Sequence, residues 1–110
     1  MVREFVVRPG CEEDFALVFQ PGGIWDDLVR SSAKGYRGCE LLRMEPGQFE
    51  LRDYWASHWE FEAFRGRSQE QIELFRRWMA GKEWIEREEL LGMFYVDEHG
   101  FDEGTGLVST

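Results

Sequence analysis

Hydrophobic and polar positions in the first third of the chain follow first a strand pattern and then a helical one. Residues 3–8 are rich in residues that favour strands, and they end at a Pro-Gly turn. Apolar residues then recur at helical spacing over residues 11–20 and again over 24–32. The Pro-Gly-Gly sequence at 21–23 separates the two runs, because proline and glycine interrupt helices. We therefore predict one strand followed by a helix in two pieces.

Two further strands are predicted in the middle of the chain. Residues 35–44 and 49–55 carry strand-forming residues, and Glu-Pro-Gly-Gln at 45–48 is a strong turn between them. The pair is expected to form an antiparallel hairpin. Because successive side chains of a strand point to opposite faces, one face of the later strand carries Phe49, Leu51, Asp53 and Trp55. The opposite face carries Glu50, Arg52 and Tyr54.

The second half of the chain begins with two helix signals. Ser57 with Glu60 is typical of a capping box, and Ser68 with Gln71 repeats the spacing. The second of these helices has a broad apolar face and is expected to end at Gly81. Residues 82–90 are predicted to add another helical turn or two. Residues 91–96 are predicted to form the fourth strand, apolar on both faces and buried on both sides.

The order strand, helix, strand, strand, helix, strand predicts an α+β domain over residues 1–96. It is typical of the ferredoxin-like βαββαβ arrangement, in which helices cover one face of a four-stranded antiparallel sheet. The other face then needs a cover, and an apolar fourth strand favours burial against a second copy of the chain. We expect a homodimer. Residues 97–110, acidic and rich in glycine, are expected to form a flexible tail or an arm laid on the partner.

Charge and composition exclude several classes of partner. The chain has 22 acidic and 13 basic residues, and its net charge of −9 repels phosphate backbones and anionic lipid surfaces. We therefore expect no nucleic-acid partner. The apolar runs are too short to span a bilayer, and the first residues lack the apolar core of a signal peptide, so no membrane partner and a cytoplasmic location are expected. Cys11 and Cys39 are expected to be reduced.

Motifs for metals and cofactors are missing from the sequence. His58 and His99 have no neighbouring histidine or cysteine at the spacing of a structural zinc site. The chain also lacks the glycine-rich dinucleotide motif, the phosphate loop, the nucleophile elbow of the hydrolases and the His-Glu-x-x-His motif. We predict neither a metal nor a cofactor.

The sequence resembles the antibiotic biosynthesis monooxygenase domain, a family of the dimeric α+β barrel superfamily. The pattern that carries the resemblance is Tyr36-Arg-Gly-Cys-Glu-Leu-Leu-Arg43, then Asp53-Tyr-Trp-Ala-Ser57 with Phe61 and Phe64, and the closing Leu90-Leu-Gly-Met-Phe94. In that family two ferredoxin-like subunits pack their sheets into a shared barrel, and each subunit keeps a pocket between its sheet and its helices. The resemblance implies such a dimer, and an activity such as oxygenation of quinols or aromatic polyketides without metal or flavin.

Heme degradation is also found in that family, but this sequence departs from its pattern. Heme-degrading members use an asparagine in the first strand, a tryptophan in the short helix and a histidine in the next helix. This chain has no asparagine, carries Phe64 where the tryptophan is expected, and has no histidine between Ser68 and Met79. These differences argue against heme degradation. The missing asparagine also weakens the match to the cofactor-free oxygenases, which place one beside a tryptophan.

Two residues are candidates for acid–base chemistry. His58 lies near the implied pocket and is a candidate base, because histidine is the side chain that generally changes its charge near neutral pH; the first position of a capped helix, however, usually faces water. Asp53 interrupts an apolar strand face, where burial would raise the pKa of its carboxyl group. The alternative for Asp53 is a salt bridge with an arginine such as Arg37 or Arg43 on the adjacent strand.

Three aromatic residues are candidates for a substrate pocket. Trp55 and Trp25 have flat rings suited to stacking on a quinol or polycyclic ligand, and Tyr36 offers a hydroxyl group. Packing in the core is the alternative for all three. Two functions from different classes therefore stay open: a cofactor-independent monooxygenase acting on a small aromatic substrate, and a non-catalytic dimeric barrel that binds a small ligand or has a structural role.

Overall fold

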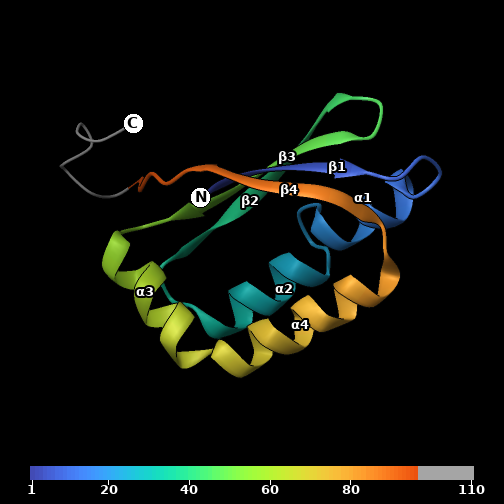
Figure 1. The fold of residues 1–110 in the computed structure, drawn as a ribbon. Coiled ribbons are helices and arrows are strands. Elements are labelled where there is room, and N and C mark those ends of the chain that lie inside the picture. Colours follow the sequence, from blue (N-terminus) through green and yellow to red (C-terminus); the bar gives the residue numbers. More distant parts are fainter. Residues whose placement is uncertain (97–110) are drawn as a thin grey trace.

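The computed structural model describes residues 1–96, and its helices all lie on one face of a four-stranded sheet (Figure 1). In chain order the elements are β1 (Val2–Val7), α1 (Glu12–Phe19), α2 (Ile24–Ser32), β2 (Tyr36–Glu45), β3 (Gln48–Trp55), α3 (His58–Arg67), α4 (Gln69–Lys82) and β4 (Ile85–Gly92). The strands pair antiparallel in the order β2-β3-β1-β4. The α+β class and the four-stranded antiparallel sheet are confirmed, and this order is consistent with a ferredoxin-like fold.

The break between α1 and α2 follows from the Pro-Gly-Gly sequence. Gly22 adopts φ +85, a conformation that favours glycine. A Cβ atom at Gly23 would lie 2.5 Å from the backbone oxygen of Leu17, so only glycine fits this close turn. The Gly22 N–H donates to the Asp26 carboxylate at 2.8 Å, which ties the turn to the first residues of α2. The predicted two-piece helix is therefore confirmed.

The core lies between the sheet and the helices. Burial alternates along β3 as predicted, with Phe49, Leu51, Asp53 and Trp55 buried. Phe15 of α1 packs on the sheet, with its ring centroid 5.1 Å from Phe5 and 4.9 Å from Phe49. Aromatic pairs at these distances stabilise a fold beyond the area they bury. This aromatic cluster fixes the first helix against the middle of the sheet.

The predicted hairpin and the predicted helix cap at Ser57 are also confirmed, but the prediction of a cap at Ser68 is wrong. β2 pairs with β3 from Tyr36↔Trp55 to Glu45↔Gln48. The Ser57 hydroxyl oxygen accepts from the Glu60 N–H at 3.2 Å, and α3 begins at His58. Ser68 makes no side-chain cap, because α4 follows α3 almost directly and the Ser68 N–H donates to the backbone oxygen of Phe64.

The prediction for the end of the domain is wrong. Residues 82–90 do not continue the helix, since α4 ends at Lys82 and Glu83 adopts the left-handed conformation at φ 59. The fourth strand is Ile85–Gly92, and most of its residues are exposed. The charged sequence of this segment favours a solvated helix, which is why a helix was predicted. The segment forms a strand instead because it pairs with the edge of β1, and this tertiary pairing overrides the local propensity. An edge strand whose residues are mostly exposed needs no continuous apolar run.

The outer face of the sheet carries polar side chains that bond to one another, beside apolar ones such as Val6 and Leu42. Gln48 donates to Glu4 at 2.6 Å, and Arg52 donates to Glu50 at 2.7 Å. The Tyr54 hydroxyl donates to a carboxylate oxygen of Glu40 on β2. The expectation of an apolar fourth strand therefore no longer supports a dimer through this face.

None of the helices within residues 1–96 is long and apolar enough to cross a membrane. The predicted tail, residues 97–110, lies outside the described residues.

Candidate functional site

A cavity of about 1000 Å³ lies between the inner face of the sheet and the layer formed by α3 and α4. Most of its wall consists of aromatic and aliphatic side chains, among them Phe5, Phe19, Trp25, Trp55, Phe61, Phe64, Ile72, Phe75 and Met79. Charged residues of α3 and α4, including Arg65 and Arg76, form part of the rim. The cavity is thus apolar inside and polar at its edge, as ligand sites usually are.

The two helices that cover the cavity are seated differently. α3 buries Phe61 and Phe64 against the sheet, whereas Met79 is the one fully buried residue of α4. Beyond Met79, α4 contributes partly buried side chains such as Ile72 and Phe75 to the wall. A helix with one buried anchor contributes less packing energy than one anchored along its length. We therefore expect α4 to be the wall that adjusts most easily to a ligand.

A histidine and a tyrosine meet at the edge of the cavity. His58 is the first residue of α3, and its side chain is 63% exposed. Its Nδ1 atom lies 3.0 Å from the Tyr95 hydroxyl oxygen, and its Nε2 atom lies 4.0 Å from a carboxylate oxygen of Glu62. Tyr95 follows β4 and forms a backbone bridge with Trp55. His58 and Tyr95 both belong to the cavity wall.

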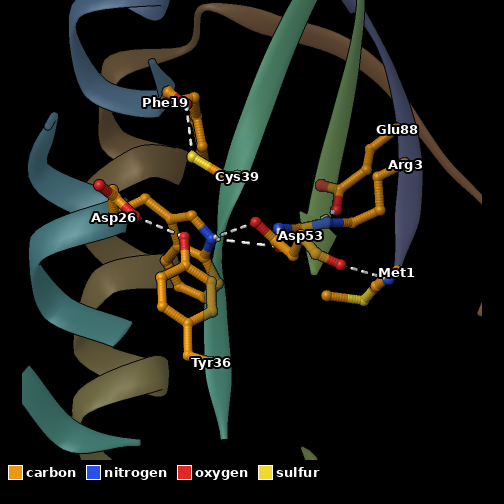
Figure 2. A network of polar contacts seen from close by, with 9 residues as sticks. Met1, Arg3, Phe19, Asp26, Tyr36, Cys39, Asp53 and Glu88 are labelled. Carbon is orange, nitrogen blue, oxygen red and sulfur yellow. Dashed lines mark hydrogen bonds and ion pairs between the residues drawn. The ribbon is translucent and has the colours of Figure 1, made fainter. Parts of the chain in front are cut away.

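Asp53 lies behind the wall, in the network of Figure 2. One of its carboxylate oxygens accepts from Arg3 at 3.1 Å, and both lie 3.3 Å from the indole Nε1 atom of Trp25. Arg3 also lies 3.6 Å from Glu88 on β4. Burial raises the pKa of the Asp53 carboxyl group, and the positive charge of Arg3 opposes this effect. The carboxylate is therefore already engaged by two donors that belong to the cavity wall.

The salt-bridge partner expected for Asp53 is corrected by the structure. The partner is Arg3 of β1, not Arg37 or Arg43 of β2. β1 lies between β3 and β4, and Arg3 shares the inner sheet face with Asp53 because it pairs with Leu51. Arg43 instead lies 3.5 Å from Glu13.

Tyr36 belongs to a second buried polar cluster. Its hydroxyl group donates to Asp26 at 2.6 Å, and Arg30 donates to the same carboxylate at 3.1 Å (Figure 2 shows the Tyr36 bond). Burial and this hydrogen bond raise the pKa of Tyr36 far above its ordinary value. Burial alone would raise the pKa of Asp26, but hydrogen bonds from Tyr36 and Gly22 and the charge of Arg30 hold it below its ordinary value. This cluster joins α2 to β2.

Trp55 is packed among aromatic rings at the end of β3. Its ring centroid lies 5.4 Å from Tyr36, 5.3 Å from Phe61 and 5.2 Å from Phe64. The side chain is buried, yet its indole nitrogen has no hydrogen-bond partner within residues 1–96.

The five candidate site residues predicted from the sequence lie either in the cavity wall or behind it. Trp25, Trp55 and His58 line the cavity, whereas Asp53 and Tyr36 lie behind it. The structure adds Arg3, Asp26 and Tyr95. An acidic residue in the first turn of the helix after the Pro-Gly-Gly break was a usable signal for Asp26. The wrong position predicted for the fourth strand hid Tyr95.

Cys39 lies near the second cluster but is poorly suited to nucleophilic chemistry. Its sulfur atom lies 3.8 Å from the backbone oxygen of Phe19, and burial raises the pKa of the thiol to about 11. A thiol with this pKa stays protonated at neutral pH. Within residues 1–96 no three histidine, cysteine, aspartate or glutamate side chains are grouped to hold a metal ion.

Comparisons with protein-family models, with curated proteins and with solved structures found no match to this chain. The similarity to the monooxygenase domain therefore rests on the residues quoted above.

Proposed function

We propose that this protein binds a small, flat aromatic molecule in the cavity between its sheet and α3–α4, and that it catalyses the reaction of that molecule with dioxygen. The observation that carries the proposal is the cavity itself. Its volume of about 1000 Å³ is at the upper end of small-molecule sites, and aromatic rings from both layers line it. Such rings favour ligands that stack or make edge contacts.

Catalysis would use the histidine at the cavity edge. In the tautomer whose Nδ1–H donates to the Tyr95 hydroxyl oxygen, the Nε2 atom of His58 carries a lone pair. It can then take a proton from an activated methylene group or hydroxyl group of the substrate. The resulting anion reacts with dioxygen: a ring CH₂ becomes C=O, and its two hydrogens leave with the second oxygen atom as water. This balance needs no metal and no flavin.

Asp53 has a positioning role in this proposal. Arg3 and Trp25 occupy its carboxylate oxygens, and both of these residues form part of the cavity wall. The carboxylate therefore supports the wall from behind and does not exchange protons with the ligand.

Non-catalytic binding is the second candidate function. It is favoured by the exposure of the His58 side chain, because a base in contact with water gains little from desolvation. Within the deeper wall, the aromatic side chains supply no base.

Oxygen consumption separates the two functions. Anthrone, which has an activated CH₂ group between two rings, is incubated with the protein under air while dissolved oxygen is followed with an electrode. We expect uptake above the buffer rate, reduced about 100-fold by His58→Gln. Trp59→Gln is the matched control, because Trp59 is the next residue of α3, is 76% exposed and lies outside the cavity wall. Binding without uptake supports the non-catalytic function, and the absence of binding contradicts both.

We also propose that two copies associate through the outer sheet face, as the family resemblance implies, and that the protein is cytoplasmic. The feature that supports association is the pair Tyr54 and Phe94, whose ring centroids lie 5.9 Å apart; Tyr54 belongs to the outer face. Sedimentation equilibrium tests the dimer. A monomer at micromolar concentration, or a dimer unaffected by Tyr54→Lys, would exclude this interface.

A further inference from the structure

A second apolar surface lies between α2 and α4, which run side by side in the helical layer (Figure 1). It forms a shallow groove of about 350 Å³, lined by Ile24 and Leu28 of α2 and by Leu74 and Trp78 of α4. Leu74 is 60% exposed, Ile24 is 49% exposed and Trp78 is 39% exposed. Single exposed apolar residues are common, but apolar residues gathered in one patch mark an interaction surface.

Leu74 lies near the centre of the solvent face of α4. Ile72 and Met79 of the same helix face the core, so the side that carries Leu74 points away from it. Glu70 precedes Leu74 by about one turn, and Arg77 follows it by about one turn on the same side of the helix. Both charged residues are exposed, and neither makes an ion pair with any residue that the structure describes.

This arrangement of charges is complementary to itself. If a second α4 helix lies antiparallel across the first at Leu74, the Arg77 of each copy faces the Glu70 of the other. A two-fold axis in the plane of the contact produces both pairs at once, as in any interface that uses the same surface on two subunits. Leu74 then meets its own copy at the centre, with an ion pair before it and another after it.

We infer that two copies of the chain associate through the α2–α4 face, with their α4 helices antiparallel and in contact at Leu74. The self-complementary charges favour a second copy as the occupant of this face. The net charge of −9 disfavours nucleic acid and anionic lipid surfaces, and it also opposes tight association of two like copies. The interface is separate from the outer sheet face, and it does not depend on the proposed function.

Charge reversal tests the antiparallel contact. The dissociation constant of the complex is measured by sedimentation equilibrium for the wild type, for Glu70→Arg and for Arg77→Glu. Each single substitution sets like charges against each other at both contacts, so the dissociation constant should rise about tenfold. An equimolar mixture of the two variants should restore the wild-type value, because opposite charges then face each other at both contacts again.

Two further variants test the location of the contact. Arg76→Glu is the matched control: it makes the same change of charge at the neighbouring residue, which belongs to the cavity rim, and it should leave association unchanged. Leu74→Asp replaces the exposed central residue and should raise the dissociation constant about 100-fold. An effect of Arg76→Glu equal to that of Arg77→Glu would show that only total charge matters, and would overturn the inference.

The Tyr54→Lys variant separates this interface from the one proposed on the outer sheet face. Association that remains in Tyr54→Lys and weakens when Glu70→Arg is added supports the α4 contact. A wild type that does not associate, or that associates equally well with each α4 variant, would mean that the α2–α4 face takes an occupant other than a second copy. Weakening by both single variants without recovery in their mixture would contradict the antiparallel arrangement.

Discussion

The ion pair between Arg3 and Asp53 offers the clearest test of how the cavity wall is held. Its nitrogen and oxygen atoms are 3.1 Å apart, and both side chains are largely buried. Two unit charges about 4 Å apart attract by about 4 kcal/mol at the effective dielectric of about 20 that suits protein sites. Desolvation offsets part of this attraction. Replacing Arg3 by methionine keeps a long unbranched side chain, and it removes the charge together with the guanidinium group that lies 5.3 Å from the centroid of the Trp25 ring.

We expect Arg3→Met to lower the free energy of unfolding by about 3 kcal/mol at pH 7, because it leaves a buried carboxylate without its cation. The midpoint of thermal unfolding should fall by about 10 °C. The loss should be smaller at pH 5 than at pH 7. Burial raises the pKa of Asp53 in the folded protein, and without Arg3 nothing as strong opposes it. The folded state then binds a proton before the unfolded state does, so stability rises as pH falls through the folded pKa.

Urea unfolding followed by tryptophan fluorescence at pH 5 and pH 7 measures these changes. Asp53→Leu is the matched control: it should cost a similar amount, but its loss should not shrink at pH 5, since the arginine stays charged. The double variant Arg3→Met with Asp53→Leu should recover to within about 1 kcal/mol of the wild type. If Arg3→Met costs less than about 0.5 kcal/mol, or the same at both pH values, the pair is not the buried contact described above.

Three further predictions address other parts of the fold. Burial raises the pKa of Cys39 from 9.0 to about 11, so iodoacetamide should alkylate it about 100-fold more slowly in the folded than in the unfolded protein at pH 8. Peptide mass spectrometry measures both rates, and comparable rates would refute the burial of Cys39. Gly35→Ala should lower the free energy of unfolding in urea by about 2 kcal/mol, because its Cβ atom would lie 2.2 Å from the Cβ atom of Glu60. Gly66→Ala, which has open space around it in α3, should raise that free energy by about 0.7 kcal/mol, and equal effects of the two variants would contradict the close packing of α3. Ser57→Ala should cost about 1 kcal/mol by the same method through loss of the α3 cap, and Ser57→Asp should restore it; an unchanged stability would show that the cap is not formed.

Much of the fold was accessible from the sequence because the signals were local. The Pro-Gly-Gly break separates α1 from α2, and the turn at residues 45–48 separates β2 from β3. Both follow from the backbone preferences of proline and glycine alone. The alternation from Phe49 to Trp55 needs one buried face and no knowledge of the partner strand. The same alternation placed Asp53 in the interior before its neighbours were known.

The parts that failed depend on contacts between distant residues. β4 has a charged sequence, and its strand conformation comes from the free edge of β1. Because the fourth strand was predicted at residues 91–96, Tyr95 was assigned to a strand and was not recognised as the partner of His58. Arg3 could not be assigned to Asp53, because its position depends on which strand lies between β3 and β4. Strand order is a property of the whole fold and leaves no local mark.

The most direct test of the central claim is to locate the bound ligand. 9-Fluorenone is titrated into ¹⁵N-labelled protein, and backbone amide shifts are mapped by NMR. We expect saturable shifts at residues around the cavity, such as Phe64, Ile72 and Met79, and none at the shallower apolar groove formed by Ile24, Leu28 and Leu74 between α2 and α4. Shifts confined to that groove, or no saturable shifts at all, would contradict ligand binding between the sheet and α3–α4.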